Sequence, residues 1–414
     1  MSKEQKINFF GFLLFFTLIF AFFSSEDLLG GAQHDFIYHK KFIILFSEDF
    51  FNTLRNYGSD DLIAQNSPVF YILISFLLKM GMGFESIRYL NVISIFIMIH
   101  IFFECLKIKF KNVDKYLLKI LVLVLFLSPT VRSLVVWPYP ILWSFIVFLL
   151  SVKYYLLFCF DKKNIFSNAL KSTFYLAAAA YLTPNISVFV IFFLYKFFLK
   201  FKSSKEFTYI IFLNILLAIP AVIFLFTNDF YFLKYSIVAV DNDVLYNIFN
   251  KIIIISTIIF FYFLPFTNKK IWKNSLEELM RLQKNHLLIL FCFFNIYFFN
   301  FPQGFGGGIF FHLSNNFFSN NLVLFLVFII SIYVFKAAGL LNFQNFLIFL
   351  CLILYNLQIS IYHKYYDPLL LFMILFLTSN NIIKNKSIFI EITKKYYYLF
   401  IFFLAASFYK VAFL

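Results

Sequence analysis

Acidic side chains gather in one stretch of this sequence, residues 24–66. It holds seven of the 20 Asp and Glu residues: Glu26, Asp27, Asp35, Glu48, Asp49, Asp60 and Asp61. Asp35 and His39 are four residues apart, so they share one face if Asp35 starts a helix. A carboxylate there can act as a general base, or join His39 in holding a divalent cation. The alternative is a solvated helix start at which Asp35 complements the helix dipole, and for His39 this structural interpretation is favoured.

Other polar residues suit the binding of a substrate, in particular one that carries a phosphate. The segment Y-H-K-Y-Y-D-P places two cations, His363 and Lys364, beside aromatic residues, a combination that fits a phosphate at a membrane surface. Snorkelling of a basic side chain toward lipid headgroups is the alternative interpretation. The candidate substrate-binding residues are His34, His39, Lys79, Arg88, Arg132, His363 and Lys364.

The bulk composition decides which solvent surrounds these residues. The chain is 62% hydrophobic with a mean hydropathy of +0.86, and 13% of its residues are charged, about half the usual share of a soluble domain. Lipid must therefore be the solvent for most of it. The net charge of +15 is explained by Lys on cytoplasmic loops, so no nucleic-acid partner is expected. The cysteines are scattered, and no zinc site is indicated.

Apolar runs of membrane length define the elements that must position the candidate residues. A transmembrane helix needs roughly 20 apolar residues, and fewer when it packs inside a bundle. Thirteen spans are expected, at about 7–23, 85–106, 116–134, 141–160, 170–184, 185–200, 208–227, 251–267, 286–302, 321–336, 341–361, 367–380 and 396–413.

The charge pattern predicts the orientation of these spans. With the N-terminus in the cytoplasm and 67–83 as an interfacial helix, every Lys-rich link falls on the cytoplasmic side: 107–119, 162–163, 196–205, 269–284 and 384–395. The acidic segment 24–66 and the C-terminus are then outside. The sequence thus predicts an all-α, polytopic helical bundle, with residues 1–414 as one transmembrane domain and residues 24–83 as a juxtamembrane helical loop carrying the site.

Three local signals refine this picture. Pro184 splits the apolar stretch 170–200, since a proline inside a helix removes a backbone hydrogen bond. Residues 269–284 mix Ile, Trp, Leu and Met with Lys, Glu and Arg, as a helix on the cytoplasmic interface does. The loop G-F-G-G-G at 304–308 lets backbone approach a ligand closely, or is a plain flexible turn.

The order of these segments resembles a known family. A first span with a cytoplasmic N-terminus precedes an acidic outer loop that has an Asp near its start. The segments N-S-P-V-F-Y-I-L-I-S-F-L-L-K-M-G, R-Y-L-N-V-I-S and S-P-T-V-R-S-L-V-V-W-P-Y-P-I-L-W follow in that order. Together these look like the C-type (GT-C) lipid-linked glycosyltransferases, and Y-H-K-Y-Y-D-P-L-L-L-F is similar to an E-P-R-Y-F-x-x-P stretch of one member. The resemblance covers about residues 1–200 and 300–375.

The resemblance implies a reaction. Such enzymes transfer a sugar from a polyprenyl-phosphate donor to a glycan or lipid acceptor at the outer membrane face, without ATP or a nucleotide. Asp35 would be the general base, and His363, Lys364, Arg132 or Lys79 would stabilise the departing phosphate. Asp35 lacks an adjacent acidic partner, so a need for a divalent cation is left open. The composition and small loops indicate a bacterial inner membrane.

Two other functions are retained as alternatives. O-antigen-type polymerases or ligases also handle polyprenyl-linked sugars, but they place several arginines in outer loops, and this chain has four Arg in all. A non-enzymatic transporter or flippase of lipid-linked glycans would place ionisable residues inside its spans. Here His100 and Glu104 are the clearest such residues, and they are expected to satisfy one another.

Overall fold

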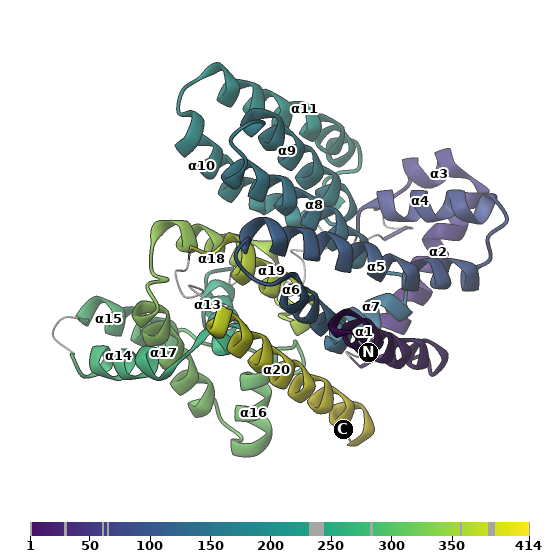
Figure 1. Ribbon diagram of the computed structural model, residues 1–414. Coiled ribbons are helices and arrows are strands. Elements are labelled where there is room, and N and C mark those ends of the chain that lie inside the picture. Colours follow the sequence, from purple (N-terminus) through teal and green to yellow (C-terminus); the bar gives the residue numbers. More distant parts are fainter. Residues whose placement is uncertain are drawn as a thin grey trace. The chain divides into compact units, whose positions relative to one another are not determined.

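The computed structural model describes residues 2–28, 31–59, 62–63, 66–231, 244–281, 285–356, 358–379 and 386–413. The chain divides into two compact units, residues 1–235 with 396–414 (unit 1) and residues 236–395 (unit 2), and each unit is described by itself. The described residues are helical apart from turns and an isolated bridge between Gly306 and Ile361 (Figure 1). The expected all-α class is confirmed, whereas one transmembrane domain over 1–414 stays a prediction.

Six helices are long and apolar enough to cross a membrane, or seven if one bent pair counts as a single span. They coincide with runs expected from the sequence. The thirteen-span count and the orientation stay predictions, because several expected spans correspond to shorter apolar helices among the described residues. The six are Lys3–Phe23, Phe84–Lys109, Pro140–Phe160, Pro184–Phe201, Lys205–Thr227 and Asn247–Phe266.

Unit 1 contains residues 24–83, the segment expected to form the first outer loop, and most of the long helices. Its helices are α1 (Lys3–Phe23), α2 (Ala32–Glu48), α3 (Phe50–Arg55), α4 (Pro68–Lys79), α5 (Phe84–Lys109), α6 (Lys115–Val122), α7 (Pro129–Val136), α8 (Pro140–Phe160), α9 (Ile165–Leu182), α10 (Val190–Phe201), α11 (Lys205–Thr227) and the part of α20 (Lys386–Phe413) that starts at Tyr396.

The expected span 116–134 is broken in two. Residues 115–127 and 129–136 form helices bent by 67°. The cause is local, because Pro129 has no backbone N–H and its ring forces the preceding residue out of the helical region. Ser128 accordingly has an extended backbone, with ψ at 120°, and its side chain accepts a hydrogen bond from the Val131 N–H to start α7. The break expected at Pro184 is confirmed, since α9 ends at Leu182 and a 3₁₀ turn, Pro184–Phe189, precedes α10.

Serine side chains join α8 and α9, which pack side by side (Figure 1). The Ser144 hydroxyl donates to the Ala179 carbonyl at 2.9 Å. Ser151 donates to the Ser172 carbonyl at 2.8 Å, and Ser172 returns a bond to the Ser151 carbonyl at 3.0 Å. Small polar residues of this kind let two apolar helices approach closely and hydrogen-bond where lipid offers no hydrophobic drive.

The acidic segment and the residues that follow it, 24–83, contain helices, as expected from the sequence. Helix α2 packs on both α3 and α4 (Figure 1). A largely aromatic core lies among these elements. Ser67 caps α4 and Pro68 occupies its first turn, positions at which both residue types favour a helix start. The core comprises Phe42, Ile43, Phe46, Tyr57, Phe70, Tyr71, Ile74, Ile87, Leu182 and Tyr231.

Unit 2 packs shorter helices around α13. They are α13 (Val244–Phe263), α14 (Lys269–Met280), α15 (His286–Tyr297), α16 (Gly308–Phe318), α17 (Leu322–Ala337), α18 (Phe343–Tyr355), α19 (Leu369–Phe372) and α20 up to Lys395. The expected amphipathic helix after Lys269 is present as α14, which packs on α17.

The glycine-rich loop of unit 2 approaches the chain's own backbone. The Gly307 N–H donates to the Ile361 carbonyl at 2.9 Å, and the Ile361 N–H donates to the Phe305 carbonyl at 2.8 Å. A Cβ built on Gly306 would lie 2.5 Å from the Ile361 oxygen, and Gly306 has a φ of +97°. The glycine is therefore required at this position by packing.

Replacing Gly306 with Ala is expected to destabilise unit 2 more than replacing Gly304 does. Both glycines have a φ near +95°, so each Ala carries the left-handed backbone strain of about 1–2 kcal/mol. Only at residue 306 does the new methyl group also collide with backbone, because nothing lies within 4 Å of a Cβ at residue 304. Thermal unfolding midpoints in detergent would measure the difference, and equal midpoints would contradict it.

Candidate functional site

Asp35 lies in the first turn of α2, as expected, and its side chain is half-buried. The cap of this helix is supplied by another residue, Asp27. Asp27 Oδ2 accepts hydrogen bonds from the backbone N–H groups of Gly31 and Gln33, both at 3.0 Å. Since Asp27 already satisfies N–H groups at this helix start, the carboxylate of Asp35 is not needed for capping.

His39 belongs to the core of the loop. It is 1% exposed, and its Nδ1 is 2.8 Å from the Tyr71 hydroxyl. Asn66 Nδ2 donates to the same hydroxyl at 3.3 Å. Burial raises the pKa of Tyr71, and the nearby carboxylate of Asp35 adds a smaller rise. The burial of His39 and its contact with the Tyr71 hydroxyl support the structural interpretation of His39.

Arg88 is held between two aromatic rings. Its guanidinium carbon lies 4.6 Å from the Phe22 ring centre and 4.3 Å from that of Trp137, a cation–π arrangement on both faces. Nη1 contacts the Glu85 carboxylate at 3.1 Å, and Nε donates to the Val136 carbonyl at 3.3 Å. Nη2 is buried and has no hydrogen-bond partner among the described residues.

Arg132 forms a buried, bidentate ion pair with Glu26. Nε and Nη2 of Arg132 each donate to one Glu26 oxygen at 2.7 Å, and the side chains are 4% and 7% exposed. The other three N–H hydrogens go to Thr17 Oγ1, the Thr17 carbonyl and the Phe126 carbonyl. A guanidinium has five N–H donors, so all of them have acceptors within the protein.

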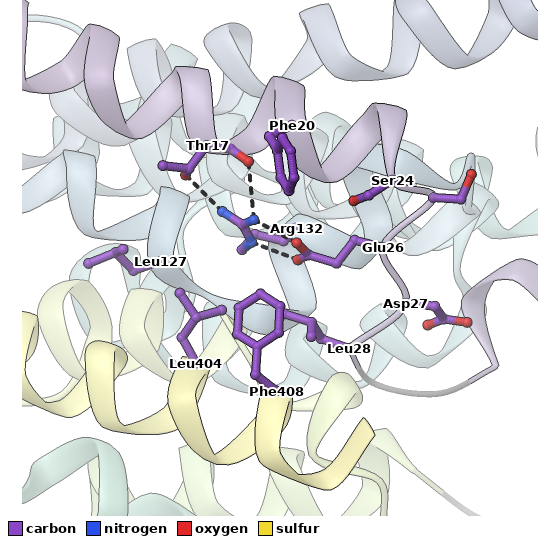
Figure 2. Close-up of a pocket in the computed structure, with 11 residues that line it drawn as sticks. Thr17, Phe20, Ser24, Glu26, Asp27, Leu28, Leu127, Arg132, Leu404 and Phe408 are labelled. Carbon is purple, nitrogen blue, oxygen red and sulfur yellow. Dashed lines mark hydrogen bonds and ion pairs between the residues drawn. The ribbon is translucent and has the colours of Figure 1, made fainter. Parts of the chain in front are cut away.

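This ion pair forms part of the wall of a cavity of about 540 Å³ in unit 1. Figure 2 shows Phe20 on one side of the guanidinium and Leu404 and Phe408 on the other, with Asp27 at the edge. The Oδ1 atom of Asp27 is buried and has no hydrogen-bond partner in the described part of the chain. The cavity therefore combines apolar walls with one carboxylate oxygen that can accept a hydrogen bond.

Trp137 brings three of the elements together. Its indole N–H donates to the Glu26 carbonyl at 3.2 Å, its ring stacks on Arg88, and its centre is 5.9 Å from that of Phe36, the neighbour of Asp35. The first turn of α2, the start of α5 and the end of α7 thus meet around this indole. Sequence reasoning missed the roles of Trp137, Glu26 and Asp27, although W-P-Y-P after an apolar helix is the available signal for an anchoring aromatic.

The remaining candidates of unit 1 are on its surface. His34 is exposed in the first turn of α2, and Lys79 is exposed as the last residue of α4. Asp60 and Asp61, from the same acidic segment, lie outside the described residues.

Glu104 forms an ion pair with Lys107 at 2.7 Å, so the expectation that His100 satisfies the Glu104 carboxylate is wrong.

The cluster Y-H-K-Y-Y-D-P, residues 362–368, lies in unit 2. His363 Nε2 is 2.9 Å from the Tyr262 hydroxyl, and Lys364 Nζ lies over the rings of Tyr362 and Tyr365 at 5.6 and 5.9 Å. Burial, with a smaller effect of His312, lowers the pKa of His363 to about 3. The expected pair of cations is therefore one cation, Lys364, beside a neutral imidazole. Asp35 is in the other unit, so a cavity shared with His363 and Lys364 stays a prediction.

Within the described ranges, no group of three or more His, Cys, Asp or Glu side chains is placed to hold a metal ion. No family model, no curated protein and no solved structure matches the chain.

Removing one partner of the buried ion pair is expected to destabilise the protein strongly. Glu26→Ala leaves the Arg132 charge buried without a counter-ion, which costs about 3–5 kcal/mol. Combining it with Arg132→Met removes the orphaned charge and should recover part of the loss. Thermal or denaturant unfolding in detergent measures this. The control is Glu4→Ala, which breaks the more exposed ion pair with Lys119. Its unfolding stability should stay close to that of wild type. A Glu26→Ala protein as stable as wild type would contradict the structural role of this pair.

The lowered pKa of His363 predicts a pH-dependent stability. The folded imidazole stays neutral down to a pKa of about 3, whereas the unfolded one takes up a proton near its ordinary value of 6.5. Between these values the unfolded state binds more protons, so stability is complete above pH 6.5 and falls as the pH drops toward 3, by up to about 1.4 kcal/mol per pH unit.

Unfolding midpoints between pH 7.5 and pH 4.5, roughly spanning that window, would test this for wild type and His363→Gln. The Gln variant lacks the titrating group and is expected to lose less stability on acidification. Its matched control is His34→Gln, which removes an exposed histidine and should keep the wild-type slope. Identical slopes for wild type and His363→Gln would contradict the prediction.

Proposed function

We propose that this chain is an integral membrane glycosyltransferase that moves a sugar from a polyprenyl-phosphate donor to a glycan or lipid acceptor at the outer, periplasmic face of a bacterial inner membrane. The observation that carries the proposal is the placement of Asp35. It is a half-buried carboxylate in the first turn of α2, a helix whose first N–H groups are bonded by Asp27, and its neighbour Phe36 packs against the Trp137 indole that also contacts Arg88.

The chemistry assigned to Asp35 is general base catalysis. Its carboxylate takes the proton of the acceptor hydroxyl while the acceptor oxygen forms a bond to the anomeric carbon of the donor. The bond between that carbon and the phosphate oxygen breaks, and polyprenyl phosphate leaves with the electron pair. In-line geometry requires acceptor and phosphate on opposite sides of the sugar ring. The base and the phosphate-binding group must therefore be separate residues.

Arg88 is the phosphate-binding candidate in unit 1 that the contacts favour. Its Nη2 is buried without a partner among the described residues, whereas all five N–H donors of Arg132 are engaged. Negative charge that grows on the leaving phosphate is stabilised best by donors already in place. Lys79, His34 and, in unit 2, His363 and Lys364 remain proposed contributors, with Lys364 as the cation of the latter pair.

An apolar cavity in unit 1 suits the lipid part of the donor. It measures about 650 Å³ and lies between α4, α9, α11 and the turn after Pro184, with Pro68, Val69 and Ile72 of α4 in its wall. Small side chains on α9 and α11, such as Ala177 and Ala218, leave the space open. Apolar cavities stay dry and bind apolar ligands, so a segment of isoprenoid chain fits. Helix α4, part of the wall of this cavity, packs on α2, the helix that carries Asp35.

Asp35→Asn is expected to reduce sugar transfer by about a hundredfold or more, since it removes the base and retains the shape. Wild type in nanodiscs would be incubated with a panel of short-chain polyprenyl-phosphate sugars and a membrane extract as acceptor source, and the released polyprenyl phosphate measured by mass spectrometry. The matched control is Glu48→Gln, at the exposed far end of the same helix, which should transfer at the wild-type rate.

Two results would overturn the proposal. The first is wild-type transfer by the Asn variant with an unchanged unfolding midpoint, which would remove Asp35 from the mechanism. The second is a folded wild-type protein that consumes no donor in the panel, which would remove the reaction itself. Loss of transfer in both Asp35→Asn and Glu48→Gln would likewise count against a specific role for Asp35.

A further inference from the structure

Helix α14 in unit 2 lies at the edge of a membrane-spanning segment. It begins at Lys269, directly after the candidate span Asn247–Phe266 and a two-residue connection. One of its faces is fixed to the protein, because Ile271 and Ser275 are buried and the helix packs on α17. An ion pair between Glu278 and Lys336 of α17, at 2.6 Å, holds it in this orientation. The rotation of the helix about its axis is therefore set by the fold.

The opposite face carries large apolar side chains. Trp272, Leu276 and Met280 follow one another at four-residue spacing, and they are 37%, 58% and 73% exposed. Residues with this spacing form one stripe along a helix. The ring of Trp272 also packs edge-on against Phe260 of α13 at 6.2 Å, which places the start of the stripe beside the spanning helix. Trp is enriched at membrane–water interfaces, where its ring sits among the headgroups.

Basic residues flank the apolar stripe. Lys269, Lys270 and Lys273 are exposed, as is Arg281 directly after the helix. Of the two carboxylates, Glu278 is engaged by Lys336, and Glu277 lies 3.9 Å from both Lys273 and Arg281. Four cations against two carboxylates leave α14 and Arg281 positive. An exposed apolar stripe bordered by lysines is typical of helices that lie in the plane of an anionic membrane surface.

From this arrangement we infer that α14 is a binding site for anionic phospholipid headgroups on the cytoplasmic leaflet. The stripe Trp272, Leu276 and Met280 enters the boundary between headgroups and acyl chains, and Lys269, Lys270 and Lys273 contact the lipid phosphates. The occupant is a bilayer surface because the helix starts where a spanning segment ends, with its charge complementary to anionic lipid. This site is separate from the proposed transfer reaction and does not depend on it.

Fluorescence quenching by brominated lipids tests the inference. The protein would be reconstituted in phosphatidylcholine vesicles that contain a fixed fraction of brominated phosphatidylglycerol or brominated phosphatidylcholine. The chain has three Trp residues, so the signal of Trp272 is the difference between wild type and Trp272→Phe. Brominated phosphatidylglycerol is expected to quench Trp272 more strongly than brominated phosphatidylcholine, by roughly twofold or more, because lysines concentrate anionic lipid around the helix.

Charge variants identify the source of the selectivity. In the triple variant Lys269→Gln, Lys270→Gln and Lys273→Gln, both brominated lipids should quench the fluorescence of Trp272 equally. The control removes the same charge from exposed lysines of unit 1, with Lys162→Gln, Lys163→Gln and Lys200→Gln, and should retain the wild-type ratio.

Three outcomes would overturn the inference. Equal quenching of wild type by the two lipids would show no preference for anionic headgroups. Absence of quenching by either lipid would mean that the stripe meets water or another protein. If the unit 1 control also lost the stronger quenching by brominated phosphatidylglycerol, the lipid preference would be an effect of overall charge.

Discussion

The buried ion pair between Arg132 and Glu26 is the contact on which the arrangement of the candidate site depends. Charges so deeply buried need a partner and full hydrogen bonding, and Arg132 meets this demand only if α1, the segment after it and α7 come together. The segment that starts at Glu26 and continues through Asp27 is thereby fixed. Asp27 in turn caps α2, so the position of Asp35 follows from a charge it does not touch.

Pro129 makes this meeting possible. A straight helix over 115–136 would carry its residues through the membrane along one axis, whereas the 67° bend redirects α7. Trp137 then lies where its indole reaches both the Glu26 carbonyl and the Arg88 guanidinium. One imino acid, through its missing N–H, thus brings an aromatic side chain to the point where three helices meet.

Hydropathy and helix chemistry predict much of this structure. The long apolar helices, the break at Pro184, the helical outer loop and the place of Asp35 at a helix start follow from local sequence signals. The partners of charged residues do not, because Glu26 and Arg132 are 106 residues apart and no periodicity connects them. For the same reason the sequence names Arg132 rather than Arg88 among the residues that would stabilise the departing phosphate. It also counts His363 as a cation, although burial lowers the pKa of its imidazole.

The serine contacts between α8 and α9 bear on how the protein is made. Ser144, Ser151 and Ser172 find their hydrogen-bond acceptors within this hairpin, and the short link that joins the two helices carries Lys162 and Lys163. These hydroxyls can therefore be satisfied within the helix pair before the later helices of unit 1 have been synthesised. Later helices such as α11, which packs on α9, then assemble against a surface that already exists.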